Sequence, residues 1–211
     1  MEKEPVSLLI LAGGRSQRMG QDKLWMEWED RPLVERVTCR VLPLAAEVVF
    51  SANSPELFRT LIERLPVPAR VVADRYPGAG PLGGLHAGLE AARHELVLTL
   101  AADLPFVNLA LVSHMVALAD GYDAVVPQTP HPITGTLHWE PLHAFYRRNC
   151  LPAIVARLAA GERQTFCFLG DVHVRIVSPA EIRRYDPELT SFLNVNTPEE
   201  WQRSQRLAQS T

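Results

Sequence analysis

The chain has 211 residues, of which 47% are hydrophobic and 21% are charged, and its formal net charge is −3. This composition is typical of one globular domain with a full apolar core, and it argues against a nucleic-acid surface or a basic membrane-binding face. No apolar stretch reaches the roughly 20 residues of a membrane helix, and the start lacks a signal-peptide pattern, so we expect a cytoplasmic protein that binds no membrane. Cys39, Cys150 and Cys167 are far apart in the sequence, so we expect neither a disulfide framework nor a zinc site.

Apolar runs alternate with helix-like segments along the first 127 residues. We expect strands at 6–11, 47–51, 70–73, 95–101 and 123–127, with helices that begin near residues 32, 55, 82 and 109 between them. The strand-like runs are continuously apolar, as expected when helices cover both faces of a parallel sheet. We therefore predict a single α/β domain with a Rossmann-like, doubly wound and mostly parallel sheet. In such a sheet the ligand binds at the carboxyl ends of the strands.

The first expected strand runs directly into a loop that is rich in glycine and positive charge, between Leu11 and Lys23. Glycines allow the backbone to approach a bound group closely, and clustered cations suit phosphate oxygens. The spacing matches neither a Walker A loop nor the G-x-G-x-x-G dinucleotide fingerprint, so the loop predicts a different kind of phosphate site. The alternative is a glycine-rich surface turn with solvated charges. The residues concerned are Gly13, Gly14, Gly20, Arg15, Arg18 and Lys23.

A polar residue follows each of the next three expected strands. These residues are Asn53, Asp74 and Asp103. Asp103 comes shortly after a strongly apolar strand, and a lone carboxylate in that place suits a Mg²⁺ ion that bridges phosphates. A helix N-cap or an Asx-turn is the alternative for Asp103, and a helix cap fits Asn53 equally well.

A second glycine-rich loop follows Asp74 and ends in the start of a helix near residue 82. Free backbone N–H groups at a helix start can face an anionic ligand, so we expect two glycine-rich loops to flank one crevice. For Gly80, Gly83 and Gly84 we expect a close approach to the ligand, and the alternative is a simple turn at Gly80 with tight helix packing at Gly83 and Gly84. For Gly88, which lies inside the helix, tight packing is the better interpretation.

Beyond residue 127 the pattern is weaker. Residues 128–140 predict an irregular excursion or an exposed hairpin over the site, followed by a helix at 151–161 that ends in glycine and a strand at 173–177. His131, His138 and His143 are spaced too irregularly for a metal cluster, so we expect solvated or capping side chains.

The stretch from Phe192 to Asn196 alternates with a period of two, which would turn Asn194 and Asn196 to the same face. The next residues, Thr197 to Glu200, form a capping box with proline at the first helical position. Asn194 is therefore the better candidate for ligand binding, whereas Asn196 can serve the helix cap.

Several short motifs, spread over nearly the whole chain, carry a resemblance to a known family. They are Leu11-Ala-Gly-Gly, Arg18-Met-Gly-x-Asp-Lys23, Asp74 through Gly84, Asp103-Leu-Pro105, Pro141-Leu-x-x-x-Tyr146-Arg147, Leu158-x-x-Gly-Glu-Arg163 and Asn194-x-Asn-Thr-Pro-Glu-Glu200. Together they resemble the molybdenum cofactor guanylyltransferases. The first motif is shared by many nucleotidyltransferases, whereas the glycine-rich third motif and the last one are similar to the guanylyltransferase branch. One departure is Ala102, where the family often has cysteine before the aspartate.

The resemblance implies an enzyme that transfers GMP from GTP to molybdopterin or the molybdenum cofactor, with Mg²⁺ as cofactor. The nucleotide would bind in the first half of the single domain, about residues 1–127, and the acceptor in the second half, about 128–211. Carried over to this chain, the nucleotide-binding residues are Leu11, Ala12, Gly13, Gly14, Lys23, Asn53, Asp74, Gly80, Pro81, Leu82, Gly83 and Asp103, and Asp103 is also the Mg²⁺ ligand. The expected catalytic residues are Lys23, Asp103, Arg15 and Arg18, and the expected acceptor-binding residues are Asn194, Asn196 and Arg147. Molybdenum-insertion and delivery proteins are the expected protein partners.

In such a reaction a phosphate oxygen of the acceptor attacks the α-phosphorus in line, and negative charge develops on the departing pyrophosphate. Cations and backbone N–H groups stabilise that charge, and no general base is needed because a phosphate monoester, with a second pKa of about 6, is ionised near neutral pH. Two other functions stay open. One is a cytidylyltransferase or sugar-phosphate nucleotidyltransferase of the same fold, and the other is a non-catalytic subunit that senses nucleotides.

Overall fold

The structure, a computed structural model, describes residues 4–13 and 23–208 of the 211-residue chain. Four residues of the expected phosphate loop, Gly14, Arg15, Arg18 and Gly20, lie outside the described residues. Within the described ranges, no helix is both long and apolar enough to cross a membrane.

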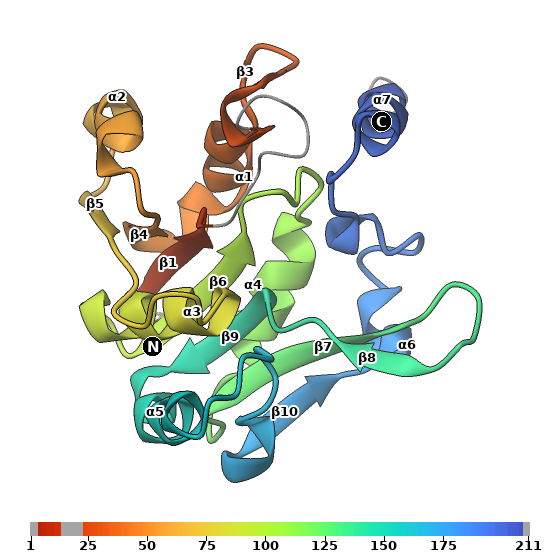
Figure 1. Cartoon of the computed structure of the whole chain (residues 1–211). Coiled ribbons are helices and arrows are strands. Elements are labelled where there is room, and N and C mark those ends of the chain that lie inside the picture. The colour runs from red at the N-terminus through yellow and green to blue at the C-terminus, as the bar shows by residue number, and fades with distance from the viewer. Residues whose placement is uncertain (1–3, 14–22, 209–211) are drawn as a thin grey trace.

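The centre of the fold is a mixed, mostly parallel sheet of eight strands (Figure 1). In spatial order the strands are β10 (Val174–Val177), β7 (Ala124–Pro130), β9 (His143–Arg147), β6 (Leu96–Ala101), β1 (Val6–Leu11), β4 (Ala45–Ser51) and β5 (Ala69–Val72), while β8 (Leu137–Trp139) pairs with β7. β1, β4, β5 and β6 run parallel to one another, and β10 runs parallel to β7. β9 is antiparallel to both of its neighbours, β6 and β7.

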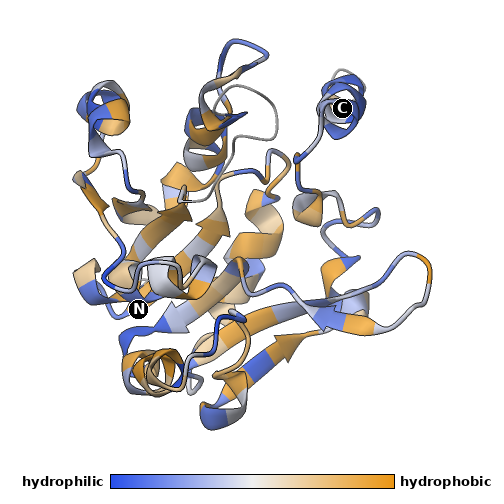
Figure 2. Ribbon diagram, in the orientation of Figure 1, coloured by the Kyte–Doolittle hydropathy of each residue, from blue (hydrophilic) through white to orange (hydrophobic). Residues whose placement is uncertain are grey.

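Helices cover both faces of this sheet (Figure 1). They are α1 (Leu33–Val41), α2 (Arg59–Arg64), α3 (Pro81–Ala91), α4 (Leu109–Ala117), α5 (Leu151–Ala159), α6 (Pro179–Ile182) and α7 (Pro198–Ala208). Two further strands, β2 (Glu27–Trp28) and β3 (Arg31–Pro32), form a separate two-stranded sheet. Leu8 and Ile10 of β1 belong to the core that includes α1 and α4, whereas Leu9 and Leu11 belong to the core that includes α3 and α5. Because both sets are buried, β1 is apolar without alternation. Figure 2 shows hydrophobic residues concentrated in the sheet and its packed helices, and hydrophilic residues along most of α7.

The predicted α/β architecture is confirmed, and each strand expected in the first 127 residues is present within a few residues of its expected bounds. β7 and β8 form the exposed hairpin, in which Gln128 pairs with Trp139. β9 is a strand that the sequence pattern did not predict. The alternating stretch near the end is not a strand, because Thr190–Phe192 is a 3-10 turn and residues 193–196 have no regular structure.

Candidate active site

A cavity of about 530 Å³ opens at the carboxyl ends of β1 and β6, where a doubly wound sheet binds its ligands. Ala12 and Gly13 continue from β1, Ala102 and Asp103 continue from β6, and Pro81 opens α3. The other walls come from the β8–β9 turn, the segment after α5 and the segment before α7. Both halves of the chain therefore contribute to one cavity.

Lys23 and Asp103 meet in this cavity, although they are 80 positions apart in the sequence. The Lys23 ammonium donates to Asp103 Oδ2 at 2.6 Å, to Asn196 Oδ1 at 2.7 Å and to the Val195 carbonyl at 3.0 Å. An ammonium has three N–H donors, so these contacts satisfy it fully. The two charged side chains are largely buried, with 12% of Lys23 and 19% of Asp103 exposed. The structure thus brings together the cation and the acid that sequence reasoning placed in one site.

The segment before α7 is held against the Asp103 loop by backbone contacts. Val195 donates its N–H to the Asp103 carbonyl at 3.2 Å. The Glu200 carboxylate accepts the N–H groups of Asn196 and Thr197 at 2.7 and 3.1 Å. The Thr197 hydroxyl in turn accepts the Glu200 N–H at 3.1 Å, which confirms the predicted capping box. Both asparagines of this segment line the cavity, without the strand that was expected to align them.

The β1 loop also borders a smaller hollow of about 80 Å³. Ala12, Gly13 and Asn53 line this hollow, and Asn53 does not line the larger cavity. Asp74, which follows β5, accepts a hydrogen bond from Ser51 Oγ at 3.2 Å. Burial raises the pKa of Asp74, and the hydrogen bond from Ser51 opposes this shift. These predicted nucleotide contacts lie along the ends of β1, β4 and β5.

α3 begins at the rim of the cavity, and Pro81 is the residue of its first turn that lines it. Gly80 precedes the helix with a φ of +63°, a left-handed conformation that glycine adopts at little cost. Gly80, Leu82 and Gly83 do not line the cavity, and Leu82 is fully buried in the core beneath α3.

Two glycines of α3 are required by packing against the sheet. A Cβ at position 84 would lie 2.8 Å from Ser51 Oγ, and a Cβ at position 88 would lie 2.3 Å from a methyl carbon of Leu9. The packing interpretation is therefore confirmed for Gly88. For Gly84 the close approach is to Ser51 of β4, which favours the packing alternative at this position.

The second half of the chain supplies a wall that sequence reasoning missed. Trp139, Glu140 and His143 line the cavity from the end of β8 and the start of β9, and Gln164 and Phe166 line it from the segment after α5. The nearest signal in the sequence is the predicted hairpin over the site, since Trp139 and Glu140 stand at its base. No spacing rule marks these residues as a group.

Glu140 is held by a short polar network at the base of the hairpin. Its Oε1 accepts a hydrogen bond from Thr129 Oγ1 at 2.5 Å and lies 3.2 Å from His138 Nε2. Burial raises the pKa of Glu140, and the contacts with Thr129 and His138 oppose this shift. The wall therefore carries a carboxylate that is partly removed from water.

His143 is 1% exposed, and neither of its ring nitrogens has a hydrogen-bond partner in the described part of the chain. The ring lies against Phe192, with 4.7 Å between the ring centroids. Burial lowers the pKa of His143 to about 4, because a buried imidazolium would lose its hydration. The expectation of a solvated or capping side chain is therefore wrong for His143, which is buried and neutral.

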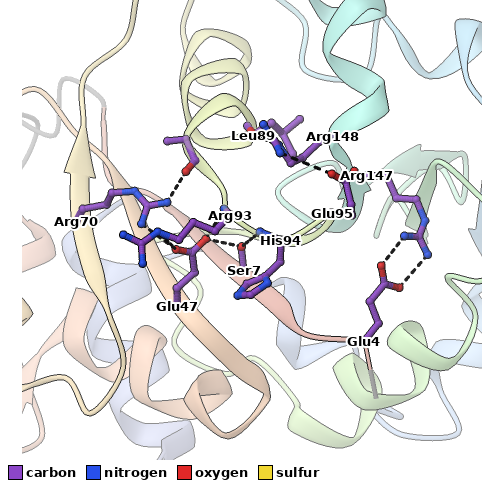
Figure 3. Close-up of polar contacts among 11 residues, drawn as sticks. Glu4, Ser7, Glu47, Arg70, Leu89, Arg93, His94, Glu95, Arg147 and Arg148 are labelled. Atoms are coloured by element: carbon purple, nitrogen blue, oxygen red, sulfur yellow. Dashed lines mark hydrogen bonds and ion pairs between the residues drawn. The ribbon is translucent and has the colours of Figure 1, made fainter. Parts of the chain in front are cut away.

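Arg147 lies at the opposite end of the sheet from the cavity. In the β6–β9 pair, Arg147 stands opposite Leu96 at the start of β6, whereas His143 stands opposite Leu100 near its end. The Arg147 guanidinium donates to the two oxygens of the Glu4 carboxylate at 2.7 and 3.0 Å (Figure 3). The predicted acceptor contact of Arg147 is corrected accordingly, because the antiparallel β9 brings its first residue to the cavity and carries its last residue away.

A cation and a carboxylate that meet at the carboxyl ends of a doubly wound sheet are typical of α/β proteins that bind phosphorylated ligands there. Comparison with known families narrows this class, because residues 8–172 match the MobA-like NTP transferase domain. The protein is therefore an enzyme of the nucleotidyltransferase class.

Two related proteins with assigned names indicate which kind of nucleotidyltransferase this is. A probable molybdenum cofactor guanylyltransferase of Chloroflexus aggregans is 38% identical over 200 residues, which cover 92% of this chain and 91% of the relative. Another, from Peptoclostridium acidaminophilum, is 34% identical over 204 residues, which cover 96% of this chain and 90% of the relative. The chain belongs to the family of molybdenum cofactor guanylyltransferases.

One solved structure agrees with this family assignment, and a second shares the fold. Molybdopterin-guanine dinucleotide biosynthesis protein A from Archaeoglobus fulgidus superposes with a TM-score of 0.78 and 25% identity, over 97% of this chain and 100% of that one. A 2-C-methyl-D-erythritol 4-phosphate cytidylyltransferase from Thermus thermophilus has a TM-score of 0.71 at 22% identity, over 97% of this chain and 99% of that one. The second likeness shows the shared fold alone.

Proposed function

We propose that this enzyme transfers GMP from GTP to the terminal phosphate of molybdopterin or the molybdenum cofactor, and releases pyrophosphate. The observation that carries the proposal is the 2.6 Å contact between Lys23 and Asp103 in a cavity that Asn194 and Asn196 also line. The volume of about 530 Å³ is in the range of small-molecule sites, roughly 300 to 1,000 Å³. The names of the related guanylyltransferases support the same activity.

The donor set at Asp103 fits a Mg²⁺ ion. The described residues contain no group of three or more His, Cys, Asp or Glu side chains that could hold a metal by themselves. Mg²⁺ suits a lone carboxylate, since it commonly takes one or two carboxylates and fills its other positions with water and substrate phosphates. Asp103 would hold the ion, which supplies positive charge to the triphosphate when bound.

Lys23 is the described cation closest to this carboxylate, and it has two roles in the proposal. Its ammonium contacts Asp103, and a bound triphosphate offers it charged oxygens in exchange. Lys23 would then stabilise the charge that develops on the pyrophosphate as the acceptor phosphate attacks the α-phosphorus. Arg15 and Arg18, outside the described residues, stay in the proposal as further cations of the loop.

The two substrates would approach from opposite sides of Lys23 and Asp103. We place the nucleotide along the ends of β1, β4 and β5, because Ala12 and Asp74 belong to the two glycine-rich loops and Asn53 lines the smaller hollow beside Ala12. The acceptor would lie on the β6–β9 side, where both asparagines of the segment before α7 line the cavity. The proposal therefore keeps the predicted division of the domain into a nucleotide half and an acceptor half.

The test is a transfer assay with purified protein, Mg²⁺, molybdopterin and one of GTP, CTP or ATP. We expect pyrophosphate release and a guanine dinucleotide product, identified by mass, with GTP preferred over the other two. A preference for CTP would instead make the enzyme a cytidylyltransferase. A folded protein that binds nucleotide but releases no pyrophosphate with any of the three would contradict the proposal.

A further inference from the structure

We propose that Glu140 selects the acceptor by accepting hydrogen bonds from the amino-pyrimidinone edge of its pterin ring. The inference rests on the proposed function, because it assigns a specificity-determining residue to the acceptor half of the same cavity. The chemistry required of the ligand is a flat heterocycle with adjacent N–H groups on one edge and a phosphate at its other end.

The backbone around Glu140 fixes the place of its side chain in the cavity wall. Its N–H donates to the Pro127 carbonyl of β7 at 2.9 Å, and its own carbonyl accepts the N–H of His143 at 3.1 Å. Trp139, the preceding residue, lines the same cavity. An indole offers a flat apolar face, and a carboxylate beside it offers acceptors, so the pair suits a planar ring with N–H donors on its edge.

The carboxylate of Glu140 is only partly satisfied by the protein. Oε1 accepts a hydrogen bond from the Thr129 hydroxyl at 2.5 Å and lies 3.2 Å from His138 Nε2. Oε2 accepts no hydrogen bond from the described residues. No lysine or arginine among those residues forms an ion pair with it, and 23% of the side chain is exposed. A carboxylate that is largely out of water gains from additional donors, so Oε2 is available to a ligand.

The charges of the cavity also orient such a ligand. Lys23 and Asp103 mark the place proposed for phosphates and the divalent ion, and Glu140 puts a negative charge in the wall formed by β8 and β9. Like charges repel, so a phosphate is disfavoured beside Glu140 and favoured beside Lys23. The ring of the acceptor is then directed to Glu140 and Trp139, with its phosphate directed to the reacting centre.

Guanine has the same donor edge as a pterin, so the experiment must separate the two. Two ligands are compared by calorimetry: a pterin with a phosphomethyl group at C6, and the matching lumazine, in which oxygen replaces the 2-amino group. The full chain is used as wild type, Glu140→Gln and the matched control Glu95→Gln. Glu95 is 63% exposed, 3.6 Å from Arg148, and does not line the cavity (Figure 3). GTP binding is measured on the same samples.

We expect wild type and the control to bind the pterin roughly 10- to 100-fold more tightly than the lumazine, since the interaction involves a charged acceptor. Glu140→Gln is expected to weaken pterin binding about 10-fold and to remove most of this preference, with GTP affinity unchanged. Glu140→Asp keeps the charge and is expected to keep a preference for the pterin. If Glu140→Gln does not fold, Glu140→Ala is the deciding variant, because it removes both acceptor oxygens and is expected to lose the preference as well.

Two results would overturn the assignment of Glu140. One is a wild-type protein that does not distinguish the pterin from the lumazine, and the other is a Glu140→Gln variant that loses affinity for GTP instead of the pterin. The transfer assay separates this outcome from failure of the proposed function. A wild-type protein that prefers the pterin but releases no pyrophosphate contradicts the function alone, whereas an active protein without the preference contradicts Glu140 alone.

Discussion

Lys23 links the loop after β1 to the Asp103 loop and to the segment before α7, through its contacts with Asp103, Val195 and Asn196. We predict that Lys23→Ala and Asp103→Ala each lower turnover by at least about 10²- to 10³-fold, because each removes a preorganised charge. Pyrophosphate release at saturating substrates measures the effect, with circular dichroism to verify folding. Arg183→Ala, a change at an exposed side chain, serves as the control. Normal turnover in either folded variant would remove that residue from the site.

The buried His143 should make the free energy of unfolding fall as the pH is lowered. Its pKa is about 4 in the folded protein and 6.5 without burial, so only the unfolded chain takes up its proton as the pH falls below about 6.5. The free energy of unfolding should therefore fall between pH 6.5 and pH 4, by up to about 3 kcal/mol from this group. His143→Phe keeps a ring against Phe192 and removes the titration. Urea unfolding at several pH values should show a flatter profile for the variant, and parallel profiles would contradict this account.

Single residues of the site were predictable from sequence where they follow a parallel strand. Lys23 and Asp103 were predicted in one site, and both line the cavity, because the direction of β1 and β6 fixes the end at which the ligand binds. The positions of Arg147 and Glu140 depend instead on β9, and no pattern in the sequence predicts that this strand runs antiparallel to β6. The direction of a strand thus decides whether its first or its last residue lies at the cavity.

At the scale of elements, α3 illustrates how tightly a helix packs over the sheet. A Cβ at Gly88 would lie 2.3 Å from Leu9 of β1. We predict that Gly88→Ala lowers the free energy of unfolding by about 1 to 3 kcal/mol, despite the better helix propensity of alanine, because the core must shift to admit the methyl group. Gly170→Ala is the matched control, since nothing lies within 4 Å of a Cβ there. If urea unfolding gave Gly88→Ala and Gly170→Ala the same free energy of unfolding, α3 would be able to shift away from the sheet without loss of stability, against this prediction.

Elements with a strong local pattern were predicted and those fixed by distant partners were not. β1, α3 and the capping box before α7 follow from apolar runs, glycine and cap residues that lie within the element itself. Residues 193–196 alternate like a strand, yet the N–H of Val195 donates to the carbonyl of Asp103 in a loop, and no strand in the described part of the chain pairs with this stretch. The hydrogen bond of Val195 depends on a loop far away in sequence, so the local residue pattern cannot predict it.

At the scale of the whole molecule, the two ends of the sheet have different tasks. The cavity lies at the carboxyl ends, and an ionic cluster around the buried Glu47 lies at the amino ends (Figure 3). The Glu47 carboxylate is 1% exposed and accepts hydrogen bonds from Ser7 Oγ at 2.6 Å, from Arg70 Nη1 at 2.8 Å and from the Arg93 N–H at 2.7 Å. These donors tie β1, β4, β5 and the end of α3 together. The cluster lies at the opposite strand ends from the reacting groups, so it can stabilise the fold without constraining the substrates.

This separation predicts a variant that loses stability but keeps its chemistry. Burial raises the pKa of Glu47, but the hydrogen bonds from Arg70, Arg93 and Ser7 outweigh it, so the pKa is lowered and the carboxylate is charged at neutral pH. Glu47→Ala leaves these donors without their buried acceptor, and we expect the free energy of unfolding to fall by about 3 kcal/mol. Well below its melting temperature, the variant should retain KM values for both substrates within about twofold of wild type, because no cavity residue has moved. Urea unfolding and the transfer assay check the two halves of this prediction. A variant of unchanged stability, or a stable one with a raised KM, would show that the two ends of the sheet are coupled.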